Sequence, residues 1–106
     1  MKSFRKGWLA GAWLAASAMA YAGPQQVDIS KFAFTPKEVT VVPGTKVVWV
    51  NHDEIPHTVS GRDKTFVSKA MDTDDRYEHV FDKEGDYAYF CAVHPYMTGV
   101  VHVRKP

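Results

Sequence analysis

Between residues 23 and 106 the chain is a series of short runs rich in β-branched and aromatic residues, each closed by a turn signal. The clearest run, Lys46–Val50, follows Pro43-Gly44 and ends at Asn51. Short runs at a spacing of about 8–12 residues are typical of β-sandwiches and barrels. No window supports a helix of three turns, and the sequence therefore predicts an all-β domain. The expected strands are 27–29, 32–34 (a continuation of the first or a separate strand), 39–42, 46–50, 58–60, 77–81, 87–91 and 100–103.

The first 22 residues differ from the rest in character. A basic start precedes an uncharged, alanine-rich stretch from Gly7 to Ala22, which ends in small residues at alternating positions. This order is typical of a secretory signal peptide, cleaved after Ala22 or, less favourably, after Ala20. The rival interpretation is a retained membrane anchor, but the stretch is shorter than the roughly 20 residues that span a bilayer. We therefore expect residues 1–22 to be a leader, 23–106 to be one domain, and no membrane span to remain after cleavage.

Removal of the leader changes the charge of the chain. The full sequence has 13 basic and 12 acidic residues, a formal net charge of +1. The leader carries three of the basic residues, so the 84 residues that follow have ten against twelve, or −2. This balance lacks the basic footprint of a nucleic-acid-binding protein.

The single cysteine, Cys91, excludes an internal disulfide and a multi-cysteine zinc module. An exported protein enters an oxidising compartment, where a free thiol is a liability. The presence of an unpaired cysteine in this chain therefore needs a functional explanation.

The chemistry-bearing residues gather near the C-terminus. Cys91, His94 and Met97 follow one another at a spacing of three, directly after a predicted strand. His57, which follows Pro56 and precedes another strand, is the best candidate for a further strong ligand. One thiolate, two imidazoles and a weak thioether make the donor set of a blue-copper electron-transfer site, in which the thiolate favours Cu(I) and the imidazoles serve both oxidation states. The pattern therefore predicts a site for one copper ion.

The sequence resembles the cupredoxins, and most closely the amicyanins, in its short Cys-x-x-His-x-x-Met loop. The likeness also covers Val39–Asn51, Pro56-His57, Tyr77–Phe81 and Gly85–Cys91. It implies a Greek-key sandwich or barrel of about seven to eight strands. It also implies that His57, Cys91 and His94 are equatorial ligands, that Met97 is the axial one, and that Asn51 ties the two ligand-bearing segments together by hydrogen bonds.

The resemblance implies a small, monomeric periplasmic electron carrier rather than an enzyme. Its partners would be redox proteins such as a c-type cytochrome or a dehydrogenase of the amine dehydrogenase kind. The expected contact patch is His94, Pro95 and Tyr96, with Phe90 as a second contact or a core aromatic.

Where amicyanins commonly have proline, this chain has Val93, whose backbone N–H we expect to donate to the Cys91 sulfur and raise the reduction potential.

Other polar residues receive plainer interpretations. His79 lies where strand alternation predicts an apolar residue, and we interpret it as an edge-strand histidine rather than a second metal site. His102 is expected to be exposed. The acidic cluster of Asp72, Asp74 and Asp75 is interpreted as a solvated loop, with docking to a basic partner as the alternative.

Two other functions use the same residues. A copper carrier or scavenger that delivers or stores metal has a related donor set, although such proteins favour open, exchangeable sites. A Cys–His nucleophilic enzyme is a weaker alternative, because no third orienting group accompanies Cys91 and His94 in the sequence.

Overall fold

The computed structural model describes residues 23–106, and the expected leader lies outside the described residues. The described chain contains eight strands and no helix, so the predicted all-β class is confirmed. Accordingly, it contains no helix long and apolar enough to cross a membrane. The strands are β1 (Gln25–Ser30), β2 (Ala33–Thr35), β3 (Glu38–Val41), β4 (Thr45–Asn51), β5 (Ser60–Gly61), β6 (Arg76–Phe81), β7 (Gly85–Phe90) and β8 (Thr98–Val103).

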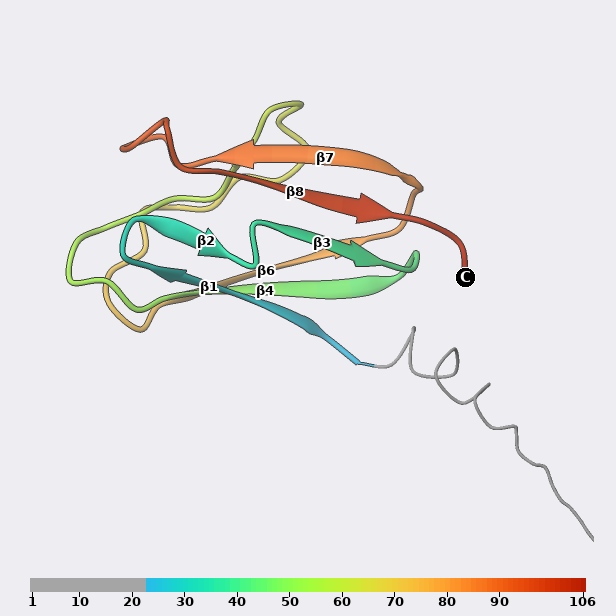
Figure 1. The fold of residues 1–106 in the computed structure, drawn as a ribbon, viewed down its shortest axis with the longest axis horizontal. Helices are drawn as coiled ribbons and strands as arrows, with labels where there is room; N and C mark the ends of the chain where they lie inside the picture. The colour runs from blue at the N-terminus through green and yellow to red at the C-terminus, as the bar shows by residue number, and fades with distance from the viewer. Residues whose placement is uncertain (1–22) are drawn as a thin grey trace, which may run out of the picture.

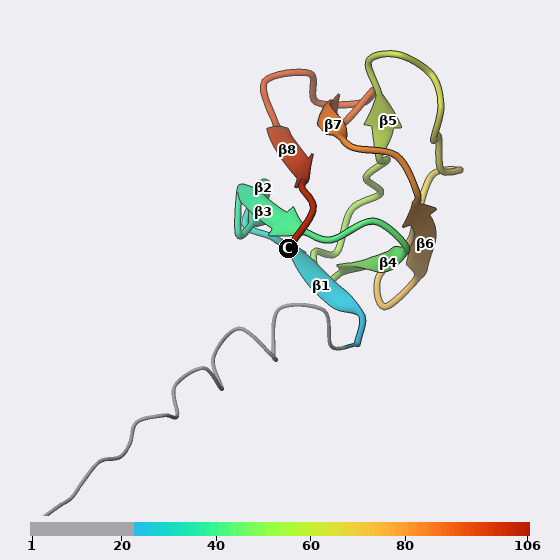
Figure 2. The same cartoon turned by 90° about the vertical axis from the view of Figure 1, so that its right-hand side faces the viewer.

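The strands form two four-stranded sheets that pack face to face (Figures 1 and 2). One sheet has the order β2-β1-β4-β6, and the other has the order β3-β8-β7-β5. Both sheets are mixed, because β1 runs parallel to β4 and β3 runs parallel to β8. The predicted sandwich of seven to eight strands is therefore confirmed.

The first predicted run divides into two strands, which resolves the alternative that the sequence left open. β1 and β2 pair antiparallel with Ser30 opposite Ala33, so only Lys31 and Phe32 form the connection. Both residues have positive φ, 54° and 59°, as a two-residue hairpin turn of type I′ requires. Asn and Gly usually fill such positions, and left-handed backbone at other residues costs about 1–3 kcal/mol each.

The core lies between the sheets and is built around Trp49, which is fully buried on β4. Its ring packs with an interplanar angle of 83° against Tyr89 from the opposite sheet and stacks on Phe66. Tyr89 in turn leaves room only for glycine at position 99, where an added Cβ would clash with the Tyr89 hydroxyl oxygen. The other fully buried apolar residues alternate along the strands, as one inward face requires. They include Val27, Ile29, Val47, Val101 and Val103.

His79 lies on β6, an edge strand, as expected. Its ring stacks on Phe66 and packs edge-to-face against Phe81. Partial burial lowers the pKa of His79, although the nearby Asp82 and Asp63 oppose that shift. It therefore packs as a neutral aromatic ring at the margin of the core.

The end of the sandwich away from the C-terminus carries the connections that matter for function. These are the β1–β2 turn, residues 52–59, residues 71–75 and the β7–β8 connection, which gather at the left of Figure 1. The expected donors all lie on these connections.

His102 on β8 is half-buried rather than exposed, because it lies between two carboxylates. Its Nδ1 is 2.7 Å from Asp86 Oδ1 on β7, and its Nε2 is 2.7 Å from Glu38 Oε1 on β3. Hydrogen bonds to Asp86 and then to Glu38 raise the pKa of His102 above its ordinary value near 6.5. The protonated ring thus links three neighbouring strands.

This linkage makes stability depend on pH. A raised folded-state pKa means that the His102 contribution is fully present below the unfolded pKa of about 6.5 and is lost as pH rises through the folded pKa. We expect the free energy of unfolding of the copper-free protein to fall more steeply in the wild type than in His102→Gln as the pH rises above about 6.5. Urea denaturation at a series of pH values measures this, and equal slopes for the two proteins would contradict it.

Candidate metal centre

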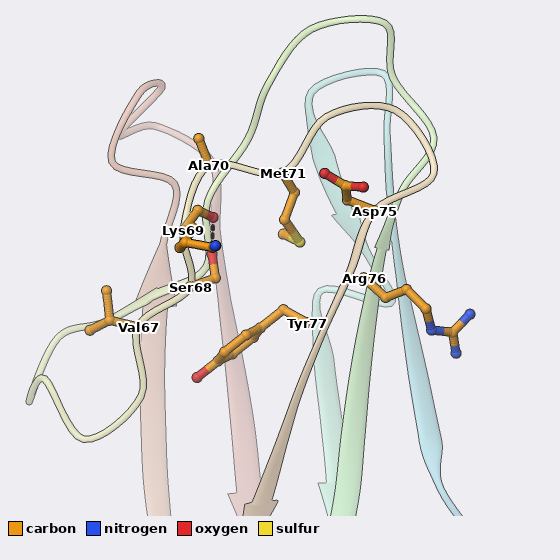
Figure 3. Close-up of a pocket in the computed structure, with 8 residues that line it drawn as sticks. All are labelled: Val67, Ser68, Lys69, Ala70, Met71, Asp75, Arg76 and Tyr77. Carbon is orange, nitrogen blue, oxygen red and sulfur yellow. Dashed lines mark hydrogen bonds between the residues drawn. The ribbon is translucent and has the colours of Figure 1, made fainter.

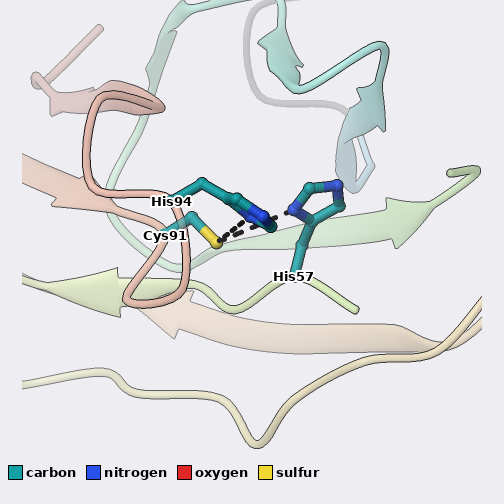
Figure 4. A group of neighbouring side chains, drawn as sticks. All are labelled: His57, Cys91 and His94. Carbon is teal, nitrogen blue, oxygen red and sulfur yellow. Dashed lines mark hydrogen bonds between the residues drawn. The ribbon is translucent and has the colours of Figure 1, made fainter. Parts of the chain in front are cut away.

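Three donor atoms from two distant segments of the sequence converge at one point (Figure 4). Cys91 Sγ lies 3.7 Å from His57 Nδ1 and 3.8 Å from His94 Nδ1, and all three atoms lie within 4.8 Å of one another. Cys91 and His57 are fully buried, whereas His94 is half-buried. The structure therefore brings together the cysteine and both histidines that the sequence singled out.

The spacing of these atoms fits a metal ion between them. With metal–sulfur and metal–nitrogen bonds of about 2.3 and 2.05 Å, a trigonal arrangement places each sulfur–nitrogen pair about 3.8 Å apart. The observed separations of 3.7 and 3.8 Å match this value. The soft thiolate selects copper over hard cations, and the two imidazoles serve either oxidation state.

The β7–β8 connection forms a closed loop that holds three of the expected donors. The Cys91 N–H donates to the Met97 carbonyl at 3.1 Å, and the Met97 N–H donates to the His94 carbonyl at 2.9 Å. These bonds continue the strand pairing that ends at Phe90 and Thr98. Met97 is 2% exposed, so its thioether is enclosed at the base of the loop.

His57 is fixed through both its backbone and its ring. Its backbone pairs with Met71 in an isolated antiparallel bridge. Its Nε2 lies 2.8 Å from Asp53 Oδ2, so the carboxylate holds the proton on Nε2 and leaves the Nδ1 lone pair facing Cys91. Partial burial favours a raised pKa for Asp53, but N–H donation by Phe32 and Lys31 and the contact with His57 outweigh it and lower the pKa.

The two ligand-bearing segments are joined by Thr58, and this corrects the role expected for Asn51. The Thr58 N–H donates to Cys91 Sγ at 3.3 Å, and the Thr58 hydroxyl accepts the Ala92 N–H at 2.7 Å. Asn51 is fully buried, but its amide donates to the Ile55 and Met71 carbonyls, and its oxygen accepts the Asp53 N–H. Because Asn51 ends β4, its side chain closes the turn before His57 and ties that turn to Met71, and it makes no hydrogen bond to the segment from Cys91 to Met97.

The hydrogen bond expected from Val93 is also corrected. Among the described residues, the backbone N–H that donates to Cys91 Sγ belongs to Thr58 and not to Val93. The chain bends at residues 92–94, and the Val93 side chain is 53% exposed. The expected effect of Val93 on the potential therefore has no hydrogen bond to support it.

The expected contact residues fall into two groups. Pro95 and Tyr96 are exposed beside His94, with Tyr96 at 70%. Phe90 follows the buried Tyr89 on β7, so its side chain points to the opposite, outer face of the sheet. It is therefore not a core aromatic. The Arg62 guanidinium lies 4.7 Å above the Phe90 ring and covers it.

Sequence reasoning missed Phe32, Asp53 and Thr58. Phe32 packs edge-to-face against both ligand histidines, at centroid distances of 5.4 Å from His57 and 5.1 Å from His94. The sequence has no Asn-Gly signal for the turn that carries Phe32, and hydrogen bonds such as those of Asp53 span more than 20 residues. For Thr58, the one available signal was its position directly after the candidate ligand His57.

A pocket of about 450 Å³ lies along the start of β6 and beside the acidic turn (Figure 3). Its lining includes Met71 and Asp75 but none of the four donor residues. Asp72, Asp74 and Asp75 are exposed, and the Asp75 carboxylate accepts the Asp72 N–H at 2.8 Å. These contacts are those of a solvated turn.

A β-sandwich with a buried cysteine, two histidines and an enclosed methionine at one end defines a cupredoxin with a type 1 copper site. The model of the copper-binding proteins of the plastocyanin/azurin family matches residues 22–104. The chain belongs to this family.

Individual relatives agree with this assignment. Amicyanin from Paracoccus versutus is 36% identical over 83 residues, which cover 74% of this chain and 63% of that protein. This chain thus spans less than two thirds of that relative. Amicyanin-alpha from Methylorubrum extorquens is 34% identical over 101 residues, which cover 91% of this chain and 85% of that protein.

Solved structures give the same result. A purple cupredoxin from Nitrosopumilus maritimus has a TM-score of 0.72 at 33% identity and covers 76% of this chain and 99% of its own. An oxidized variant of amicyanin has a TM-score of 0.74 at 31% identity, with 77% and 83% coverage. A copper-containing nitrite reductase from Thermus scotoductus has a TM-score of 0.73 at 31% identity and covers 78% of this chain, but only 23% of the reductase is matched.

The Thr58 link between the two donor segments can be tested directly. Thr58→Val keeps the shape and the backbone N–H but removes the acceptor of the Ala92 N–H and the hydroxyl partner of Ser60, so we expect a loss of at least about 1 kcal/mol in the free energy of unfolding. Thr65→Val is the matched control, because its hydroxyl bonds only to Asp63 at the surface. Urea denaturation of the copper-free proteins measures both, and equal losses in the two variants would contradict the assigned role.

Proposed function

We propose that this protein is a small periplasmic electron carrier that uses one type 1 copper ion and exchanges electrons by outer-sphere transfer. His57, Cys91 and His94 would be the equatorial ligands and Met97 the axial one. The observation that supports this most strongly is the convergence of the thiolate and both imidazoles within 4.8 Å in a largely buried cluster. A donor set that the fold already holds together needs little rearrangement when the charge on the metal changes.

Copper supplies a one-electron couple at this site when it is bound. The chain contributes by holding the donors and by excluding water. Asp53 fixes the His57 tautomer, the Thr58 N–H stabilises negative charge on Cys91 Sγ, and the loop bonds of Met97 keep the 91–97 segment closed. Cys91 and His57 are inaccessible to solvent, so His94 is the ligand through which electrons would reach the surface.

A partner would dock on the apolar residues that surround His94. Pro95 and the highly exposed Tyr96 are suited to a small, short-lived contact of the kind that redox proteins form. We propose a c-type cytochrome or a dehydrogenase of the amine dehydrogenase kind as that partner. The basic and apolar character of residues 1–22 supports export to the periplasm, where such partners occur.

The burial of the donors weighs against the two other functions. Metal delivery requires an exchangeable site, whereas Cys91 and His57 are fully buried and Met97 is 2% exposed. A nucleophilic cysteine requires access for its substrate, which full burial of Cys91 denies.

Addition of Cu(II) to the purified copper-free protein distinguishes these functions. We expect an intense blue absorption that ascorbate bleaches reversibly. Cys91→Ser should lose the blue colour, because the thiolate produces it, while keeping the fold. A colourless copper complex would favour metal trafficking, and alkylation of Cys91 with no copper binding would favour an enzyme; either result would contradict the proposal.

Tyr96→Ala tests the docking surface. The variant should keep the blue absorption but transfer electrons to an oxidised c-type cytochrome several-fold more slowly, because exposed aromatic side chains contribute strongly to protein contacts. Val80→Ala is the control, since Val80 is an exposed apolar residue on β6. Stopped-flow absorbance measures the rates, and equal rates for the two variants would exclude Tyr96 from the contact.

A further inference from the structure

An aromatic ring closes the outer side of the donor cluster. The Phe32 ring packs against the His57 ring at an interplanar angle of 84° and against the His94 ring at 81°. The centroids of the two imidazole rings are 5.0 Å apart. Phe32 is 41% exposed, so it has one side toward solvent and the other toward both ligand rings. It therefore lies between the donor cluster and water.

The backbone that places this ring is in an unusual conformation. Lys31 and Phe32 have φ values of 54° and 59°, a region in which bulky side chains are rare. A turn of this type is normally built from Asn and Gly. Strain of this kind persists where the surrounding structure enforces it, and it is concentrated at functional sites.

Asp53 enforces the conformation and connects it to the site. Its Oδ1 accepts the Lys31 N–H at 2.7 Å, and its Oδ2 accepts the Phe32 N–H at 3.0 Å. The same Oδ2 lies 2.8 Å from His57 Nε2. One carboxylate thus holds both the turn that carries the aromatic ring and the imidazole that the ring covers.

Phe32 and Met97 also line one cavity beside the site. A small cavity of about 120 Å³ lies between Phe32 and Tyr96, and Met97 and Lys37 are among its other lining residues. The ring therefore lies between water and the two ligand imidazoles, and it also borders the cavity that Met97 lines.

We propose that Phe32 is a lid on the metal site: a positioning residue that holds the His94 ring against the cluster and slows the release of the metal. This inference rests on the proposed copper site. On this proposal, the positive-φ turn at residues 31–32 helps to retain the metal in addition to connecting β1 to β2. The exposed face of the same ring borders the docking patch, so the lid also belongs to the surface that a partner approaches.

Transfer of copper from the Cu(I)-loaded protein to excess bathocuproine disulfonate tests the lid. We expect Phe32→Ala to release copper about tenfold faster than wild type, because two aromatic contacts with ligand rings are lost. Phe32→Tyr keeps the ring and should release copper at the wild-type rate. Val80→Ala, the control at an exposed apolar site on β6, should also match wild type.

A second variant separates retention from folding. Glycine is favoured at positive φ, so Phe32→Gly should leave the copper-free protein at least as resistant to urea as wild type while it releases copper faster. A purely structural residue would give the opposite result, with the copper-free protein clearly weakened.

The outcomes are distinguishable. Wild-type release rates in Phe32→Ala and Phe32→Gly, or equal acceleration in Val80→Ala, would overturn the lid. Clear weakening of copper-free Phe32→Gly would overturn it as well. Absence of the blue absorption in the wild type would instead overturn the proposed copper site.

Discussion

The hydrogen bonds of Thr58 join the two halves of the metal centre, and the geometry of the site depends on them. His57 lies on the segment that leaves β4 of the first sheet, whereas Cys91 directly follows β7 of the second. The Thr58 backbone donates to the Cys91 sulfur and its hydroxyl accepts the Ala92 N–H, so the donors are aligned before any metal arrives. The packing of Trp49 against Tyr89 fixes the same two sheets deeper in the core.

The solvent exposure of the donor residues increases from the interior of the sandwich to its surface. Cys91 and His57 are sealed from solvent, and His94 alone of the two imidazoles reaches the surface. Phe32 and Tyr96 flank it as exposed aromatics. Such an arrangement would let electrons pass through one ring edge without opening the site, which the proposed carrier requires if it is to keep its metal during repeated contacts.

The sequence was sufficient for the fold class and for the donors of the loop after β7, because both rest on local patterns, whereas His57 was singled out by its place between Pro56 and a predicted strand. Strand alternation and the short loop from Cys91 to Met97 are readable from neighbouring residues, and the structure confirms the convergence of Cys91, His94 and His57. The hydrogen bond from Val93 was wrong because the direction of an N–H in a bent loop is not encoded by spacing. Contacts such as those of Asp53 with the β1–β2 turn join distant segments and depend on positive φ, so no local pattern announces them.

The central claim is that this fold holds one copper ion in a donor set that does not change with its charge. X-ray absorption spectroscopy of the copper-loaded protein in both oxidation states at neutral pH tests it most directly. We expect one sulfur and two nitrogen neighbours at short distance in both states, with only slight changes in bond length. Loss of a nitrogen neighbour on reduction at that pH, or a site without a short copper–sulfur bond, would contradict the claim.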